Sequence, residues 1–548
     1  MQQITRQLIQ TASLEASLVN NRNNNLFYLI ALTAIGLLAY AYTSHLTFLK
    51  IDPRLDEIRR GLVSLEMMLS GNYWVPTING EPYLNKPPLY NWLLVLSYKI
   101  FGINEFALRI PVIAAIFFYG WVIFHFAAKY IHRQTALLAA LLFMSNGRIL
   151  IYDSLMGLID ILYSSLVFLS FMLIYHLGQQ KRWFALFAWS YVLVVAGYLM
   201  KGLPSIVYQG FALLVYFGIT KQWKILFHRA HFVGIGIMAG LLGLYYAIYF
   251  SKVNLPPATL FTRIVTESTM RTYREDTNWW QDFALHFTTY PLVFGYHYAP
   301  WTILLLLVIR KKWLSFLRAN HFIWFCAILF FACIFIYWLS PYIIARYLFM
   351  LLPLCFLVAA FYYDWVSKPV EKLRLFIEYL LVGVLVIAGT GIWVLPFIEV
   401  TSNLPGVVWK TLITSALLLA CAFAATRMPA YRLAFIVLGI VASRLGFNWF
   451  VVVQRGEFSI QQQQEAEMVM QKAGNRPIYL QNGADHGNPD GLSFNIALKQ
   501  KRILPLTDSI YAGAVYVTDS ATMVQRPHTV LYKWGSEFQP NHYLVTYP

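Results

Sequence analysis

Acidic and basic side chains that could do chemistry stand at the ends of long apolar runs in this 548-residue sequence. Asp56 and Glu57 follow the first run, Lys86 lies in the stretch YLNKPP, and Asp160 opens a later run. Carboxylates at such positions can take a proton from a reactant or orient it, and an ammonium can bind a phosphate. The two prolines after Lys86 stiffen the chain and fix the level of its ammonium. These residues predict acid–base and phosphate chemistry.

Each of these residues also has a structural interpretation. Asp56 and Glu57 suit the first turn of an amphipathic helix, where acids interact favourably with the helix dipole. Lys86 suits an interfacial lysine that reaches the lipid headgroups, and Asp160 suits a helix start. Asp160 is the sharper candidate, because an acid at the edge of a membrane span is costly unless water, a cation or a substrate compensates it.

The composition identifies lipid as the solvent of the apolar runs. Hydrophobic residues make up 59% of the chain and charged residues 12%, against about 45–50% and about 25% in soluble domains. This excludes a soluble multidomain enzyme, a coiled coil, a collagen and a disordered chain. The formal charge of +17 resides mainly in short connections, where Lys and Arg set membrane orientation, so nucleic-acid binding is not expected. The four cysteines lie in apolar runs without disulfide or metal-ligand spacing.

About thirteen runs are long and apolar enough to cross a bilayer, which takes roughly 20 residues each. They lie at 27–48, 109–130, 135–152, 158–178, 183–200, 203–219, 231–250, 290–309, 322–339, 343–363, 376–396, 408–426 and 431–452. Alternate connections are rich in Lys and Arg, which places them and the N-terminus in the cytoplasm and the C-terminus outside. The first run is predicted to be a retained anchor. The candidate residues then fall on the outer face, where the segment after Asp56 is expected to form an interfacial helix.

From about Gln454 the composition changes to that of a soluble domain. A helix is predicted for SIQQQQEAEMVMQKAG and a strand for PIYL. A second helix followed by a strand is predicted for GLSFNIALKQKRILP, and further strands are predicted for AVYVTD, TVLYKW and HYLVTYP. We expect a transmembrane catalytic domain at 1–452 and a soluble α/β extracytoplasmic domain at 453–548. The predicted fold class is an all-α polytopic membrane protein, with interfacial helices in its first outer loop and this small domain at its C-terminus.

The order of motifs resembles a known group of membrane glycosyltransferases. Asp-Glu at 56–57 precedes SGNYWVPTINGEPYLNKPPLYNW and NEFALRIP, and then come Asp160, Lys-Gly-x-Pro at 201–204, Pro-Trp at 300–301 and Arg-Tyr at 346–347. This order is similar to that of the aminoarabinose–lipid A transferases, which belong to the GT-C class with the protein O-mannosyltransferases (glycosyltransferase family 39). The similarity covers about residues 50–360, and the first outer loop is its most specific part.

The resemblance implies roles for individual residues. Asp56 and Asp160 correspond to the two acids of the catalytic centre, which face each other across a cavity. Lys86 matches the lysine that holds the donor phosphate, and Arg346 and Tyr347 match groups presented to the donor phosphate or sugar. The further candidate substrate-binding residues are Glu57, Tyr83, Lys201, Arg271 and Arg274.

The outer loop at 251–289 is expected to close over a bound lipid sugar with Glu267, Arg271 and Arg274. The two arginines could also stabilise the negative charge that develops on a leaving phosphate. This loop therefore joins the first outer loop as a predicted part of the site.

One position departs from the pattern of the group. Its members often have Glu directly before the lysine, and in some that Glu helps to bind a metal, but this sequence has Asn85. Asn is a neutral and weaker ligand, so a zinc site is not expected there. No cofactor is assigned, and a divalent metal stays open, with His286 and His297 as the remaining candidate ligands.

We predict an inverting glycosyltransferase, either a hexosyl- or a pentosyltransferase, in the inner membrane of a bacterium. Its donor would be a polyprenyl-phosphate monosaccharide and its acceptor lipid A or another outer glycolipid. Three alternatives stay open: a protein Ser/Thr acceptor, a polymerase or ligase with a pyrophosphate-linked donor, and a lipid or solute transporter. The transporter would need polar groups inside the membrane, for which the sequence offers Glu378 and Arg444.

Overall fold

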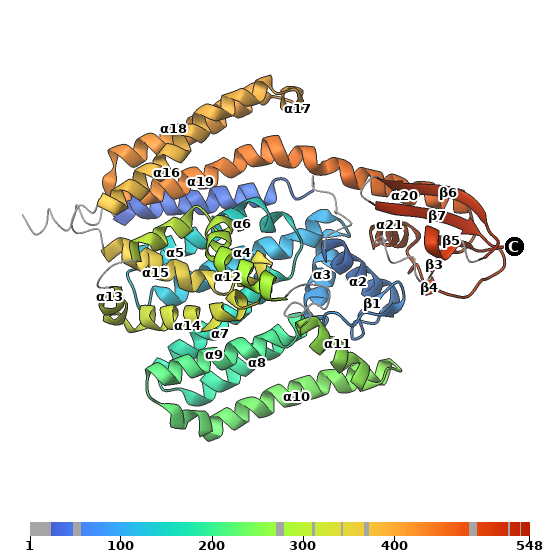
Figure 1. Cartoon of the computed structure of the whole chain (residues 1–548), viewed down its shortest axis with the longest axis horizontal. Coiled ribbons are helices and arrows are strands. Elements are labelled where there is room, and N and C mark those ends of the chain that lie inside the picture. Colours follow the sequence, from blue (N-terminus) through green and yellow to red (C-terminus); the bar gives the residue numbers. More distant parts are fainter. Residues whose placement is uncertain are drawn as a thin grey trace, which may run out of the picture.

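The structure is a computed structural model. It describes residues 24–47, 56–269, 279–308, 313–340, 344–365, 372–481, 490–523, 526–536 and 539–548. Helices predominate among these residues, and most of them gather into one bundle that carries a small sheet domain at one end (Figure 1).

The bundle is built from apolar helices that bury their side chains against one another. They are the helix Asn24–Thr43, α4 (Glu105–Ala127), α5 (Arg133–Met144), α6 (Gly147–Ile151), α7 (Asp160–Gln179), α8 (Trp183–Lys201), α9 (Pro204–Ile219), α10 (Arg229–Lys252), α12 (Trp279–His297), α13 (Trp313–Ala319), α14 (His321–Trp338), α15 (Leu352–Trp365), α16 (Lys372–Gly391), α18 (Val407–Arg427) and α19 (Arg432–Phe447). Shorter segments join them: η1 (Asp153–Leu155), η2 (Trp223–Phe227), η5 (Ile392–Phe397), α17 (Glu399–Ser402), η6 (Pro429–Tyr431), η7 (Asn448–Val452) and η8 (Val453–Gly456). Helices α4, α5, α7 and α15 form much of the core, whereas α10 exposes most of its apolar length, as a helix that faces lipid does.

The number of membrane spans differs from the sequence-based count. Nine described helices are long and apolar enough to cross a membrane, and a tenth arises if Arg133–Met144 and Gly147–Leu155, bent by 46°, count as one. Two expected spans are shorter helices, Pro204–Ile219 and Leu352–Asp364. The expected span at 290–309 is divided between α12 and the 3₁₀ helix η3 (Trp301–Val308). The polytopic helical class is confirmed, and the count of thirteen is not.

Polar groups inside the bundle are held by protein partners. Glu378 on α16 is 1% exposed and accepts a hydrogen bond from Arg374 Nε at 2.7 Å, and it also pairs with Arg432. Arg444 on α19 donates to Asn448 Oδ1 at 2.7 Å and to Ser154 Oγ in η1 at 3.0 Å. Buried charges are retained when such partners compensate their desolvation. The two groups that would have suited a transporter therefore cross-link helices.

The first outer loop folds into two helices joined by a hairpin. Helix α2 (Asp56–Ser70) packs on α3 (Leu89–Phe101), and strands β1 (Thr77–Ile78) and β2 (Glu81–Pro82) pair antiparallel between them. The expected helix after Asp56 is present. It is covered by protein along most of its length, because both α3 and the C-terminal domain lie against it.

Glu66 on α2 organises the hairpin. Its carboxylate is fully buried, and it accepts hydrogen bonds from Thr77 Oγ1 at 2.8 Å and from the N–H groups of Asn79 and Gly80 at 2.6 and 3.2 Å. Asn79 and Gly80 both have positive φ, of 52° and 82°, which residues Asn and Gly adopt at the least cost in a tight turn. This turn sets the start of the segment that carries Lys86.

The C-terminal domain is an α/β unit with a five-stranded sheet. Its elements are α20 (Glu457–Ala473), β3 (Ile478–Gln481), α21 (Asp490–Gln500), β4 (Leu506–Thr507), β5 (Val515–Asp519), α22 (Ser520–Met523), β6 (Thr529–Ser536) and β7 (Gln539–Thr546). The strand order is β4-β3-β5-β7-β6, with β4, β3 and β5 parallel and β7 antiparallel to both β5 and β6. The expected helices and strands are present, and the boundary at 453 stays a prediction.

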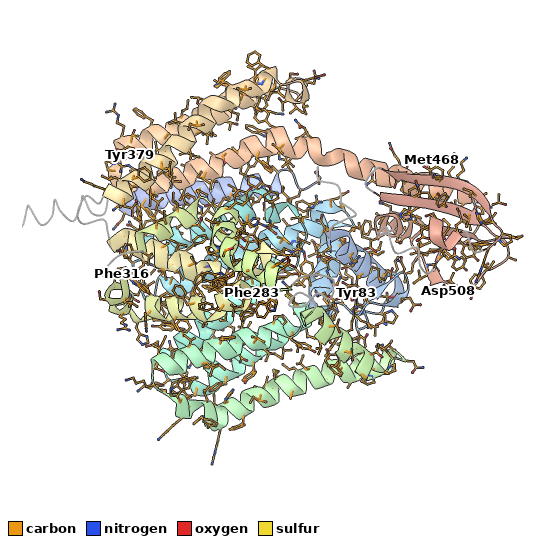
Figure 2. The ribbon with its side chains drawn as sticks, in the orientation of Figure 1. Tyr83, Phe283, Phe316, Tyr379, Met468 and Asp508 are labelled. Carbon is orange, nitrogen blue, oxygen red and sulfur yellow. The ribbon has the colours of Figure 1, made fainter. Side chains whose placement is uncertain are left out.

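The C-terminal domain docks on the first outer loop. Arg59 Nε on α2 contacts Asp490 Oδ2 at 2.9 Å, and the Leu506 N–H donates to the Asn79 carbonyl at 2.9 Å. Figure 2 labels Tyr83 of that loop between the bundle and the sheet domain. The helix that begins at Asp56 is thus fixed from two sides.

Candidate active site

A cavity of about 370 Å³ opens where the first outer loop meets the bundle. Its walls come from the YLNKPP segment, the first turn of α7, the junction of α8 and α9, helix α11 (Pro257–Thr269), the end of α14 and the 3₁₀ helix η4 (Ala345–Leu348). Figure 1 shows α11 between the first outer loop and helices α8 and α10. Segments distant in the sequence thereby meet at one level. The volume lies within the range of about 300–1,000 Å³ found for ligand pockets.

Asp160 lies beside this cavity, next to Lys201, which lines it. It is the first residue of α7, where the helix dipole favours a negative charge, and it is 3% exposed. Its carboxylate pairs with Lys201 and lies 3.2 Å from Arg346 Nε. The acid is thus buried because two cations compensate its charge.

Arg346 joins the two candidate catalytic acids. Its Nη2 donates to Asp56 Oδ2 at 2.9 Å while its Nε lies against Asp160. The Asp56 side chain keeps 48% of its surface exposed, against 5% for Asp160. One acid is therefore open to an incoming reactant and the other is enclosed.

The Lys-Gly-x-Pro motif places Lys201 by ending one helix and starting the next. Gly202 follows α8 with a φ of +85°, which favours glycine, and Pro204 opens α9, where its missing N–H costs nothing. The Lys201 ammonium then lies over the ring of Tyr347 at 4.0 Å and over that of Tyr163 at 5.2 Å. Both tyrosines line the cavity.

Lys86 lines the cavity on the side of the first outer loop. Its Nζ lies 3.5 Å from Glu267 Oε2 on α11. The pKa of Lys86 is lowered to about 8, mainly by burial and also by the neighbouring Arg60 and Lys201, against the opposing effect of Glu267. The site therefore holds a cation that lacks full hydration and is ready to accept an anion.

Arg263 links α11 to the YLNKPP segment. Its Nε donates to Asn85 Oδ1 at 3.0 Å, and its Nη2 lies 3.1 Å from Glu267. His286 Nε2 contacts the Tyr337 carbonyl at 3.2 Å. In the described part of the chain no three His, Cys, Asp or Glu side chains gather as metal ligands. The residues present do not fit a divalent metal at Asn85.

Glu57 and Tyr83 lie away from the cavity. Glu57 is 1% exposed and accepts hydrogen bonds from Arg109 Nε and Nη2 at 2.8 and 3.1 Å, and from the Gly157 N–H at 2.6 Å. A Cβ on Gly157 would meet the Leu108 carbonyl at 2.6 Å, so only glycine permits this approach. Tyr83 packs in an apolar cluster with its ring 5.3 Å from the Arg60 guanidinium.

Some of the remaining candidate substrate-binding residues lie around Asp160, and the others fall outside the described residues. Lys201, Arg346 and Tyr347 surround Asp160, as described above. Arg271 and Arg274 fall within 270–278, outside the described residues, and their binding role stays a prediction.

Some residues at the cavity were not singled out from the sequence. Tyr163, Tyr208 and Tyr337 line it, and a hydrogen bond joins Tyr208 to Tyr337. Tyrosines inside apolar runs give no distinguishing signal. Arg263 has one, because it stands four residues before Glu267, which the sequence did single out, on an amphipathic outer helix, and this is the spacing of an ion pair.

Comparisons with known proteins find relatives of part of this chain. The model of the dolichyl-phosphate-mannose-protein mannosyltransferase family matches residues 85–250. An undecaprenyl phosphate-alpha-4-amino-4-deoxy-L-arabinose arabinosyl transferase of Proteus mirabilis is 34% identical over 137 residues, 22% of this chain and 25% of that protein. Its counterpart in Pseudomonas savastanoi is 31% identical over 162 residues, 28% and 30% of the two chains. The matched segments thus span between a quarter and a third of these relatives.

Solved structures extend the likeness to nearly the whole fold. The crystal structure of ArnT from Cupriavidus metallidurans in the apo state has a TM-score of 0.65 at 18% identity and covers 93% of this chain and 97% of that one. The structure of the same protein bound to undecaprenyl phosphate has a TM-score of 0.63 with the same coverage. The solved structures therefore show that this chain has the fold of ArnT over nearly its whole length.

Proposed function

We propose that this protein is an inverting membrane glycosyltransferase that moves a monosaccharide from a polyprenyl-phosphate donor to lipid A or another extracytoplasmic glycolipid. The observation that carries the proposal is the bridge of Arg346 between Asp56 and Asp160, beside a cavity that Lys86 lines. The names of the relatives, which state an undecaprenyl-phosphate sugar, and the ArnT structure with undecaprenyl phosphate support this donor class.

The cations of the site suit the leaving phosphate. Lys86 binds the donor phosphate by exchanging its contact with Glu267 for one with phosphate oxygen. The acceptor oxygen attacks the anomeric carbon as the bond from that carbon to the phosphate oxygen breaks, and the electron pair leaves with the polyprenyl phosphate. Lys86 stabilises the negative charge that collects there. A single displacement of this kind inverts the anomeric carbon.

The two acids take different roles because their exposures differ. Asp56, half exposed, accepts the proton of a hydroxyl acceptor. With a phosphate acceptor no base is needed, and Asp56 then orients the acceptor together with Arg346. Asp160, enclosed by Lys201 and Arg346, holds these two cations at the donor.

The setting that we propose is the inner membrane of a bacterium. The N-terminus lies in the cytoplasm and the C-terminal domain in the periplasm, which follows from the Lys- and Arg-rich connections on one side. The cavity then opens on the outer face, where lipid A precursors and glycolipids are found.

Transfer of labelled sugar tests this function. Membranes that contain the wild type or Lys86→Met receive polyprenyl-phosphate sugars labelled in the sugar, and the label is followed in the lipid and protein fractions. We expect label in a lipid acceptor with the wild type and a large loss with Lys86→Met. Label in protein would favour the Ser/Thr acceptor. Intact donor with every sugar, together with flipping of a lipid, would contradict the glycosyltransferase proposal.

A further inference from the structure

Three tyrosines line the cavity on the side of the helix bundle, and we refer to them as the tyrosine floor: Tyr163, Tyr208 and Tyr337. Helices α7 and α14 both pack against α9, and the three helices lie together in Figure 1. Each helix carries its tyrosine about one turn or less from the helix end at the site. Tyr163 follows Asp160 by three residues of α7, so its backbone lies about 4.5 Å further into the bundle. The floor is thus neutral and lies next to the charged groups of the site.

Tyr163 is the member of the floor whose hydroxyl lacks a protein partner. The residue is 1% exposed, and its buried hydroxyl makes no hydrogen bond to any residue that the structure describes. Tyr208, in contrast, donates a hydrogen bond to the Tyr337 hydroxyl, and the two rings stack with centroids 6.3 Å apart. A buried hydroxyl without a partner destabilises the folded state, and such groups are rare in proteins. A ligand in the cavity can supply the missing hydrogen bond.

Close packing confines the ring of Tyr163. Helix α8 approaches it through Gly197, where a Cβ would lie 3.6 Å from Tyr163 Cε2 and 2.8 Å from Ser205 Cβ. The Lys201 ammonium lies over the same ring, 5.2 Å from its centroid. The ring therefore stays at the cavity, and its hydroxyl depends on what the cavity contains.

Of the three parts of a polyprenyl-phosphate sugar, the sugar suits this floor best. The phosphate is an anion, and the cation Lys86 lines the same cavity. The polyprenyl chain has no hydrogen-bonding group, so it would leave the Tyr163 hydroxyl unpaired. Sugar hydroxyl groups both donate and accept hydrogen bonds, as a tyrosine hydroxyl does.

We propose that the tyrosine floor binds the donor sugar, and that the Tyr163 hydroxyl forms a hydrogen bond with one hydroxyl group of that sugar. This inference rests on the proposed function. It makes Tyr163 a residue that determines which sugar is accepted, while Lys86 binds the phosphate of the same donor.

Replacement of Tyr163 by phenylalanine tests the inference, because it removes only the hydroxyl. The full-length protein in lipid nanodiscs is titrated with polyprenyl phosphate and with polyprenyl phosphates that carry glucose, galactose, arabinose or 4-amino-4-deoxyarabinose. We expect Tyr163→Phe to bind the best of the sugar donors about fivefold more weakly than the wild type does, which corresponds to the loss of one hydrogen bond. The affinity for polyprenyl phosphate without a sugar should stay the same. The thermal unfolding temperature should not fall, since the hydroxyl has no partner in the unliganded protein.

Tyr98→Phe is the matched control. Tyr98 is 2% exposed, and its hydroxyl also makes no hydrogen bond to a described residue, but it does not line the cavity. We expect this variant to bind every one of these lipids as the wild type does. A loss in Tyr163→Phe alone would therefore come from the cavity and not from the removal of a buried hydroxyl in general.

Deoxy forms of the best-bound donor identify the hydroxyl group that Tyr163 contacts. At one ring position, the wild type should discriminate against the deoxy donor about fivefold more strongly than Tyr163→Phe does. Equal discrimination by the two proteins at every position would contradict the proposed hydrogen bond.

Unchanged affinity of Tyr163→Phe for the sugar donors would overturn the inference, and so would an equal loss for lipids with and without a sugar. Wild-type protein that binds polyprenyl phosphate but none of the sugar donors would overturn it as well. Wild-type protein that binds none of these lipids would instead refute the proposed donor class. The failure of the inference and the failure of the proposed function are thus distinguishable.

Discussion

The Glu57 carboxylate connects α2 with α4, through its ion pair with Arg109, and with the loop before α7, through the Gly157 N–H. Glu57 directly follows Asp56, and its carboxylate also holds Gly157, three residues before Asp160. Both partners are almost fully buried, with 1% and 2% of their side chains exposed. Removal of one partner from such a pair costs about 3–5 kcal/mol, because the other charge stays buried without compensation. This is a large share of the about 5–15 kcal/mol that stabilises a typical folded protein.

Two substitutions of Glu57 separate stability from positioning. Glu57→Gln removes the charge but keeps an oxygen for the Gly157 N–H, whereas Glu57→Ala removes both. We expect both variants to lose about 3–5 kcal/mol in denaturant unfolding of the purified protein, followed by tryptophan fluorescence. We expect only Glu57→Ala to lower kcat further, because the link between α2 and the loop before α7 is then lost.

A double-mutant cycle provides the control. Glu57→Gln combined with Arg109→Met should lose no more stability than either single variant, since no buried charge is left unpaired. Losses in the double variant that equal the sum of the single ones would refute the coupling. Equal kcat values in the Gln and Ala variants would refute the positioning role of Glu57.

Three further predictions concern the phosphate site, the metal and the C-terminal domain. The pKa of Lys86 is lowered to about 8, and only its protonated form binds phosphate. The value of kcat/KM for the donor should therefore fall as pH rises through about 8, by about tenfold per pH unit above it. A flat profile to pH 9.5 would contradict this role. Arg263 Nε donates to Asn85 Oδ1, so this oxygen is already bound by a protein group. Treatment with EDTA should therefore leave turnover unchanged. A loss of turnover that zinc or magnesium restores would show a metal site. Arg59→Met removes the Arg59 guanidinium from the buried Asp490 carboxylate. Limited proteolysis should then release the C-terminal domain faster than it does from the wild type. An unchanged cleavage rate would mean that this pair does not hold the domain.

The sequence predicts the parts of the fold that depend on local pattern. The long apolar runs became helices, and the alternation of helix and strand after Gln454 became the sheet domain. The count of thirteen spans is not confirmed where a proline or a sharp bend divides an apolar run, as at 290–309, because hydropathy does not register the break. Which helices pack against each other could not be predicted, because each apolar run reports only on its own helix.

In the candidate site, too, local sequence pattern predicts individual residues, whereas their contacts depend on how the helices pack. The sequence allowed four residues to be proposed as site residues, because each stands at the edge of an apolar run or in a motif of the group: Asp56, Lys86, Asp160 and Arg346. That Arg346 bridges the two acids could not be predicted, since it depends on how α2, α7 and η4 pack. Glu57 resembled its neighbour in the sequence, and only the structure shows its side chain directed to Arg109.

The central claim is that Asp56 and Asp160, bridged by Arg346, belong to the active site, where Asp56 acts on the acceptor and Asp160 holds the cations at the donor. Its most direct test measures donor affinity and single-turnover release of polyprenyl phosphate in the wild type, Asp56→Asn and Asp160→Asn, with thermal unfolding as the control for folding. We predict that Asp56→Asn binds the donor within about threefold of the wild type and loses turnover by at least about a hundredfold. Asp160→Asn should weaken donor binding as well, because Lys201 and Arg346 lose their shared partner. Turnover near the wild-type rate in both variants, with donor bound, would contradict the assignment of this site.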